Sequence, residues 1–373
     1  MKKVVSYIYV FGFLFALLLP LIIYPFVSGK LDHNNYENRE LTSKEVVLAS
    51  NWSNFFPNLQ LYIDDNMPYK NECVAWNKQI DLNVFHDLYD ESVFVGKENW
   101  LFYKKDGCIQ DYRGGYVLNK EELEAYRIAA QALQDNLQNK GIKLFIMITP
   151  NKEEVMGDLY LPDKVTVKNE KSRTDQIVAY LKANTDIPVM YSKDIVCEYR
   201  DKGVQVWKKY DTHWNNLGAY VATQELLEQM GKDTISLESL TIEQSGQGSG
   251  DLANMIGMGS QFNDDWNYSI TGYKEEIQTE MVENIPQSNL SYAKFESNIH
   301  TGDKILCIGD SFLGYMEPYI AVNFDSSIFV HRDNYGSFEY DLIDKEKPDV
   351  IVFQTAERFI SYFDDAMNVF AQK

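Results

Sequence analysis

The chain has 373 residues, of which 35 are Lys or Arg and 55 are Asp or Glu, so its formal net charge is −20. A chain this acidic is not a general nucleic-acid binder, because proteins that neutralise phosphates carry clusters of Lys and Arg. Hydrophobic residues make up 45% of the sequence and aromatic residues 14%, which excludes a mainly disordered chain.

The N-terminal segment predicts a membrane anchor. Lys2 and Lys3 precede an uncharged, mostly apolar run over residues 4–29. About 20 apolar residues cross a bilayer core, whereas the apolar part of a cleaved signal peptide has about 7–15. We therefore expect residues 1–29 to be a single-pass transmembrane signal anchor in the cell membrane. The positive-inside rule then places the two lysines in the cytoplasm and the chain after Lys30 in the extracellular or periplasmic space. Cleavage after Val27-Ser28-Gly29 is the alternative.

The next segment, residues 30–89, is polar at first and then aromatic, and we interpret it as a stalk that becomes the edge of a domain. Residues 90–373 are expected to form the catalytic domain. Asn119 and Glu122 have the spacing of a capping box and predict a helix that runs to about Gly141. The continuous apolar run that follows, residues 142–149, is typical of a strand buried on both faces.

This pattern of a helix followed by a buried strand recurs. Helices are predicted near 169–182 and 215–230, and short core strands are predicted at 187–192, 303–311, 326–333 and 348–355. Right-handed crossovers between such strands give an α/β fold, a three-layer α/β/α sandwich with a mostly parallel sheet. Residues 232–300 break the pattern and are interpreted as an insertion or lid beside the sheet.

The segment Gly309-Asp310-Ser311-Phe312 directly follows one of the predicted core strands. Ligands of α/β proteins bind at the carboxyl ends of such strands. Ser311 is thus placed as a nucleophile on a tight turn, and its backbone amide is placed as an oxyanion donor. The alternative interpretation is a plain Asp-Ser helix cap.

A serine nucleophile needs a base, and His213 in the segment Asp211-Thr212-His213-Trp214-Asn215 is the first candidate. Asp211 is near enough in sequence to orient the imidazole. His331, at the end of a predicted strand, is the other candidate base. Alternatively, Asp211 and Asn215 only cap a helix. Asp211 and His213 could also be two metal ligands, but no further His or carboxylate cluster completes a metal site, so we expect no metal.

At these residues the chain resembles the SGNH hydrolase superfamily, in particular the alginate O-acetyltransferase branch with AlgJ-like and AlgX-like domains. The resemblance rests on the 211–215 segment followed by the 309–312 segment, an order that corresponds to a circular permutation of ordinary SGNH esterases. It covers roughly residues 90–360. Supporting segments are 96–102, 150–152, 250–252, 347–349 and 357–358.

The resemblance implies an enzyme that moves acetyl groups onto a cell-surface or extracellular polysaccharide, without a cofactor. It makes Ser311 the nucleophile, His213 the base and Asp211 its orienting partner, and it implies a membrane-bound O-acyltransferase as the partner that supplies acetyl. Gly336 corresponds to an oxyanion-hole residue, whereas residues 354–357 lack the asparagine of the esterases.

Asn151 and Trp214 are the further candidates for substrate contacts. Two other functions stay open from the sequence. One is a polysaccharide acetyl esterase with the same triad. The other is a non-catalytic scaffold that holds a biosynthetic complex together or binds polysaccharide, with Trp100, Trp214 and Trp266 among the rings that could stack on sugars.

Overall fold

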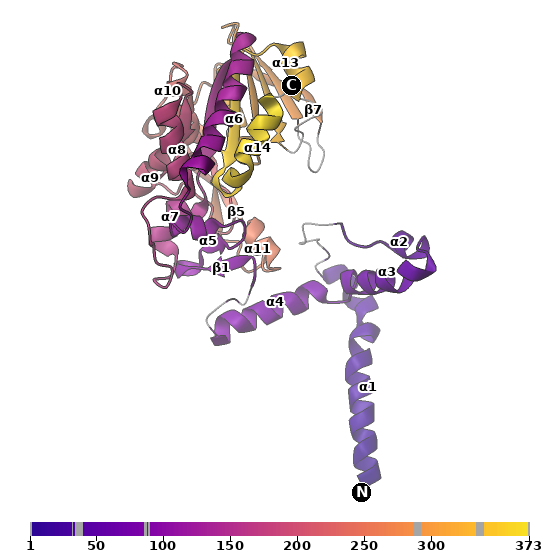
Figure 1. The fold of residues 1–373 in the computed structure, drawn as a ribbon. Helices are drawn as coiled ribbons and strands as arrows, with labels where there is room; N and C mark the ends of the chain where they lie inside the picture. Colours follow the sequence, from indigo (N-terminus) through magenta and orange to yellow (C-terminus); the bar gives the residue numbers. More distant parts are fainter. Residues whose placement is uncertain are drawn as a thin grey trace. The chain divides into compact units, whose positions relative to one another are not determined.

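A computed structural model of the chain describes residues 2–31, 33, 40–85, 88, 90–285, 292–332 and 339–371 (Figure 1). Its contacts divide the chain into two compact units. One comprises Met1–Asp90 with Ala253–Gln261, and the other comprises Glu91–Leu252 with Phe262–Lys373. Ser311, His213 and Asp211 all belong to the second unit.

The first unit is helical. Helix α1, Lys2–Val27, continues into a 3-10 turn at Ser28–Lys30. Within the described part of the chain, one helical stretch, Tyr7–Lys30, is long and apolar enough to cross a membrane. The region predicted as a stalk contains α2 (Lys44–Leu48), α3 (Trp52–Asp65), α4 (Lys70–Ile80) and a π-helical turn at Asp81–Phe85.

A seven-stranded sheet with the order β4-β3-β11-β9-β10-β8-β7 forms the centre of the second unit. The parallel part consists of β4 (Val189–Tyr191), β3 (Lys143–Thr149), β11 (Val350–Ala356), β9 (Lys304–Gly309) and β10 (Ser326–His331). At the other edge β8 (Tyr292–Ser297) pairs antiparallel with β10, and β7 (Thr279–Ile285) pairs antiparallel with β8. The α/β class is confirmed, but the sheet is mixed. Its antiparallel edge was not predicted, and it arises because part of the predicted 232–300 insertion is hydrogen-bonded into the sheet as β7 and β8.

Helices pack on both faces of this sheet, because side chains of each buried strand alternate between two apolar clusters. On β3, Ile146 points into one cluster and Met147 into the other. The first cluster contains side chains of α6 (Lys120–Asn139), α8 (Arg173–Asn184), α13 (Glu339–Glu346) and α14 (Phe363–Ala371). The second contains side chains of α7 (Lys152–Tyr160), α9 (Lys193–Asp201), α10 (Asn216–Gln229) and α12 (Glu317–Ala321). Figure 1 shows α6 and α14 lying along the same face.

Local signals set the helix starts. The capping box of Asn119 and Glu122 is present at the start of α6, as predicted. The side chain of Asn215 accepts the first free N–H groups of α10. Helix α8 begins at Arg173 and not near Asn169, because Ser172 provides the cap.

The remaining strands form two separate antiparallel pairs. Strands β1 (Val93–Val95) and β2 (Leu101–Tyr103) form one antiparallel pair, and β5 (Thr241–Gly248) and β6 (Asp265–Thr271) form another. Helices α5 (Cys108–Tyr112) and α11 (Asp251–Met255) lie in the connections. The predicted insertion therefore contains a separate antiparallel pair, β5 and β6, and the edge strands β7 and β8 of the main sheet.

Candidate active site

Ser311 lies on the turn directly after β9 and is exposed. The buried carboxylate of Asp310 anchors this turn by accepting the N–H of Phe312 at 3.1 Å and the N–H of Ala356 at 2.6 Å. Gly309 permits the close approach to β11, since a Cβ atom there would lie 2.2 Å from the side-chain oxygen of Gln354. The turn is thus fixed to the end of β11 while the Ser311 hydroxyl stays accessible.

The structure brings the three predicted catalytic side chains together. Ser311 Oγ lies 2.7 Å from His213 Nε2, and His213 Nδ1 lies 2.7 Å from Asp211 Oδ1. The backbone N–H of His213 donates to the same oxygen of Asp211 at 2.9 Å. Burial favours a raised pKa for the Asp211 carboxyl, but the hydrogen bonds and charge of His213, with the charge of Lys208, hold this pKa well below its usual range. Asp211 is therefore an anion at neutral pH.

A buried lysine supports the loop that carries Asp211. Lys152 is 2% exposed, and its Nζ donates to the carbonyl oxygens of Lys209 at 2.8 Å and of Asp211 at 3.0 Å. The N–H of Lys209 donates to Asp265 Oδ2 at 2.6 Å. Burial lowers the pKa of Lys152 to about 7, against the opposing charges of Glu153 and Asp211. The loop is therefore held through its backbone and not by apolar packing alone.

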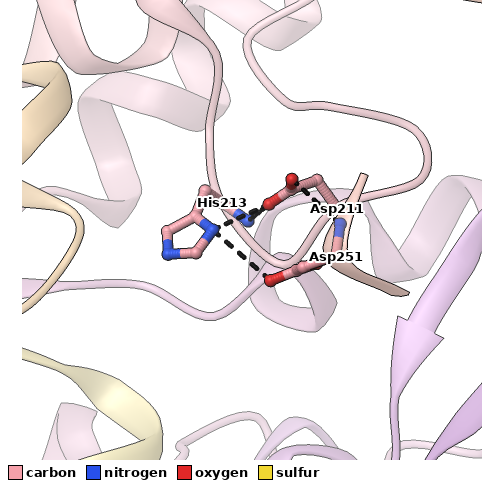
Figure 2. A group of neighbouring side chains, drawn as sticks. All are labelled: Asp211, His213 and Asp251. Atoms are coloured by element: carbon pink, nitrogen blue, oxygen red, sulfur yellow. Dashed lines mark hydrogen bonds and ion pairs between the residues drawn. The ribbon is translucent and has the colours of Figure 1, made fainter. Parts of the chain in front are cut away.

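A second carboxylate, that of Asp251, also lies at His213, and it was not among the site residues predicted from the sequence. Figure 2 shows the imidazole of His213 facing the carboxylates of both Asp211 and Asp251. Asp251 Oδ2 is 3.5 Å from His213 Nδ1. The signal for it in the sequence is the Gly250-Asp251-Leu252 segment, which supports the family resemblance. A Gly-Asp pair by itself does not indicate catalysis, since it also occurs elsewhere in the chain.

Asp211, His213 and Asp251 each offer a ligand atom, and these atoms lie within 4.8 Å of one another. The oxygen atoms of both carboxylates, however, already accept hydrogen bonds from the protein. Asp211 Oδ1 accepts from the backbone and the ring of His213, and the carboxylate of Asp251 accepts from the N–H and the hydroxyl of Thr212. A cation would have to displace these donors, so the arrangement suits proton transfer better than coordination.

His331, the other candidate base, ends β10, where it is in register with Gly309 of β9. The hydroxyl of Ser311 is nevertheless bonded to His213. The geometry therefore favours His213 over His331 as the partner of the serine.

Asn151 and Trp214 have different surroundings from those of the three central residues. Asn151 is 3% exposed, its N–H donates to Glu357 at 2.9 Å and its Oδ1 accepts the N–H of Arg358 at 3.1 Å. The Nδ2 atom of Asn151 is buried and has no hydrogen-bond partner among the described residues. The expectation that Trp214 contacts substrate is wrong, because its ring is completely buried and packs 5.3 Å from that of Phe312, centroid to centroid. Gly336 lies outside the described residues.

The sequence matches the family model described as the SGNH hydrolase-like domain of acetyltransferase AlgX over residues 93–312. The Probable alginate O-acetylase AlgJ of Pseudomonas syringae pv. tomato is 25% identical over 204 residues, covering 54% of this chain and 48% of that protein. Its counterpart in Pseudomonas putida is 28% identical over 145 residues, covering 38% of this chain and 35% of that protein. The chain thus spans about half or less of the length of these relatives.

Solved structures share the fold at low sequence identity. A DHHW family protein from Eubacterium siraeum has a TM-score of 0.56 at 13% identity, with 76% of this chain and 96% of that chain covered. Bacillus cereus PatB1, with a sulfonyl adduct, has a TM-score of 0.52 at 13% identity, with 72% and 97% covered. These likenesses show that the fold is shared over about three quarters of this chain.

Proposed function

The chain belongs to the family of SGNH hydrolase-like domains represented by acetyltransferase AlgX, and from this premise we propose that it transfers acetyl groups to the hydroxyls of a cell-surface or extracellular polysaccharide. The transfer runs through an acetyl ester on Ser311. The observation that carries this proposal is the unbroken hydrogen-bonded series from Ser311 Oγ through His213 to Asp211, with both links at 2.7 Å.

In the first half-reaction Ser311 Oγ attacks the carbonyl carbon of the acetyl donor while His213 Nε2 takes the hydroxyl proton. The negatively charged Asp211 holds the ring so that Nε2 is the free acceptor, and it stabilises the imidazolium that forms. When the tetrahedral intermediate collapses, the bond to the donor oxygen breaks and His213 gives its proton to that oxygen. Acetyl-Ser311 and a neutral His213 remain.

The second half-reaction repeats these steps with a sugar hydroxyl as the nucleophile. His213 takes the proton of the hydroxyl as the hydroxyl oxygen attacks acetyl-Ser311, and then returns a proton to Ser311 Oγ. The exposure of Ser311 supports access by a polymer.

The oxyanion of both intermediates needs hydrogen-bond donors. The backbone N–H of Ser311 has no acceptor within the described part of the chain and is the first donor we assign. Asn151, whose buried Nδ2 group is also without a partner among those residues, stays a prediction for this role. Gly336 stays a prediction for this role.

The acceptor, the donor and the location follow from the family and from the N-terminal helix. The named relatives are alginate O-acetylases, whereas the net charge of −20 favours a neutral or cationic glycan over a polyuronate here. A membrane-bound O-acyltransferase is the partner proposed to supply acetyl groups. The apolar stretch Tyr7–Lys30 is proposed to anchor the chain in the cell membrane with the catalytic unit outside. Recovery of the protein in the soluble fraction, shortened by this segment, would instead indicate cleavage.

Detection of the acyl-enzyme tests the mechanism. Full-length protein in detergent is incubated with a small activated acetyl ester, and the Ser311-containing peptide is examined by mass spectrometry. We expect an acetyl group on this peptide in the wild type and in Ser239→Ala, which changes an exposed serine, and no turnover in Ser311→Ala. Turnover retained by Ser311→Ala would refute the assignment.

Product analysis distinguishes the alternatives. With an acetyl donor and an oligosaccharide, a transferase adds acetyl groups to the sugar, whereas an esterase with the same residues removes them from an acetylated one. Unchanged acetylation in cells that carry Ser311→Ala, together with intact glycan binding, would instead support a scaffold.

A further inference from the structure

The segment Gly250–Leu252 lies against the loop that carries Asp211 and His213. The N–H of Leu252 donates to the carbonyl oxygen of Tyr210 at 3.1 Å, and the N–H of Asp251 donates to Asp211 Oδ2 at 3.2 Å. A Cβ atom on Gly250 would lie 2.4 Å from the Tyr210 oxygen and 2.6 Å from the Asp211 Cβ. Only glycine permits this approach, so the contact is a built feature of the site.

The side chain of Asp251 completes the contact. Its Oδ1 accepts the N–H of Thr212 at 2.6 Å, and its Oδ2 accepts the hydroxyl of Thr212. Thr212 is the residue between Asp211 and His213, so Asp251 fixes the spacing of the two. The same Oδ2 atom is 3.5 Å from His213 Nδ1, the ring atom that also bonds Asp211 Oδ1 (Figure 2).

We propose that Asp251 is a second positioning carboxylate of the acetyl-transfer site, which orients the Asp211–His213 loop through Thr212 and adds negative charge that stabilises the imidazolium form of His213. This inference rests on the proposed function. Asp251 acts through His213 and Thr212 and touches no reacting atom itself.

The charges around Asp251 and His213 are consistent with this role. Asp211 faces His213 from the same loop, and the amino groups of Lys152 and Lys208 interact with both carboxylates. A further titratable neighbour is Tyr315, whose ring centroid is 5.9 Å from that of His213 and whose hydroxyl accepts from Lys208 at 2.7 Å. Burial, followed by the charge of Asp211, raises the pKa of Asp251, while His213 and the Thr212 hydrogen bonds oppose that rise. Both oxygens accept from donors of Thr212, as the ionised carboxylate does.

The pH dependence of turnover separates the charge of Asp251 from its structural contacts. Removal of a negative charge beside the imidazole disfavours the protonated form of the ring, because that form loses a partner of opposite charge. In Asp251→Asn we therefore expect the rising limb of the pH–rate profile for hydrolysis of an activated acetyl ester to move about one unit toward lower pH. At the plateau, we expect kcat/KM to fall about tenfold, because a group that positions His213 in the transition state is lost.

Three variants serve as comparisons. Thr212→Val removes a hydrogen bond but keeps the charge, so it should lose rate with an unshifted profile. Asp251→Glu keeps the negative charge, so the rising limb of its pH–rate profile should lie at the same pH as in the wild type. Asp163→Asn removes a charge from an exposed residue that pairs with Lys97, and should leave both rate and profile unchanged.

Titration of His213 by NMR of histidine-labelled protein gives a readout that does not depend on acetyl transfer. The signal is assigned by its loss in His213→Gln. His213 signals that change over the same pH range in Asp251→Asn and the wild type would overturn the proposal, as would full activity of Asp251→Asn. If Asp251→Asn does not fold, a shifted limb in Thr212→Val would overturn it equally. Activity retained by Ser311→Ala would refute the proposed function, whereas the titration would still test the charge of Asp251.

Discussion

Replacement of Asp211 by Asn is the most direct test of how the charge at the site is used. The carboxylate of Asp211 accepts from the backbone and the ring of His213 and from the backbone of Asp251. An Asn side chain of the same shape can keep some of these hydrogen bonds. If its amide group donates to His213 Nδ1, however, the ring carries its proton on Nε2, and Nε2 then cannot accept the proton of Ser311.

The magnitude follows from the geometry. His213 Nδ1 and Asp211 Oδ1 are 2.7 Å apart, and the Asp211 side chain is 11% exposed. Two unit charges about 4 Å apart at an effective dielectric constant of about 20 interact by about 4 kcal/mol. Loss of that stabilisation of the imidazolium in the transition state slows the reaction about 1,000-fold. The wrong tautomer raises the loss toward about 10,000-fold, as in other serine triads.

The assay is hydrolysis of an activated acetyl ester by the full-length protein, with kcat and KM measured separately. We expect kcat to fall and KM to change little, because Asp211 acts on the transition state and does not contact the donor. Asp135→Asn is the matched control, since Asp135 is an exposed residue of α6 that accepts from Gln131. A loss of less than tenfold in a folded Asp211→Asn protein would refute this account of the site.

Three further variants test the supports of the site. Gly309→Ala should destabilise the fold by about 1–3 kcal/mol and reduce turnover, because the new Cβ would lie 2.2 Å from Gln354 Oε1; an unchanged melting temperature would contradict the predicted clash. Asn215→Ala should lower the free energy of unfolding by about 1 kcal/mol, since its side chain caps the start of α10. Denaturant titration measures this loss, and Asn184→Ala, at the last residue of α8, is the control that removes no such cap. The pKa of Lys152 is lowered to about 7 by burial, so the unfolded chain binds more protons between about pH 7 and pH 10 and the free energy of unfolding rises with pH by up to about 1.4 kcal/mol per unit. In Lys152→Met this contribution should disappear, and an equal slope in both proteins would show that Lys152 is charged when folded.

Much of this architecture could be predicted from the sequence, because its signals are local. The capping box at Asn119 sets the start of α6 whatever surrounds it, and the continuous apolar runs of β3, β9 and β11 are needed by any strand with helices on both faces. The relation of Asp211 to His213 is local too, since one residue separates them and the backbone of the loop brings their side chains together.

Other features depend on tertiary contacts and have no local signal. The antiparallel edge formed by β7 and β8 depends on pairing with β10, and the burial of Trp214 depends on the position of Phe312 after β9. An amphipathic aromatic ring suits either a sugar-binding surface or a core, so its sequence context does not distinguish the two.

The sequence by itself determined the fold class, the buried strand that precedes Ser311 and the local pairing of Asp211 with His213. Only the tertiary structure decided that Lys152 holds the carbonyl groups of the loop and that Asp251 lies at the imidazole. The physical reason is that periodicity and capping act over a few residues, whereas the charges around a buried site are set by segments that meet only when the chain has folded.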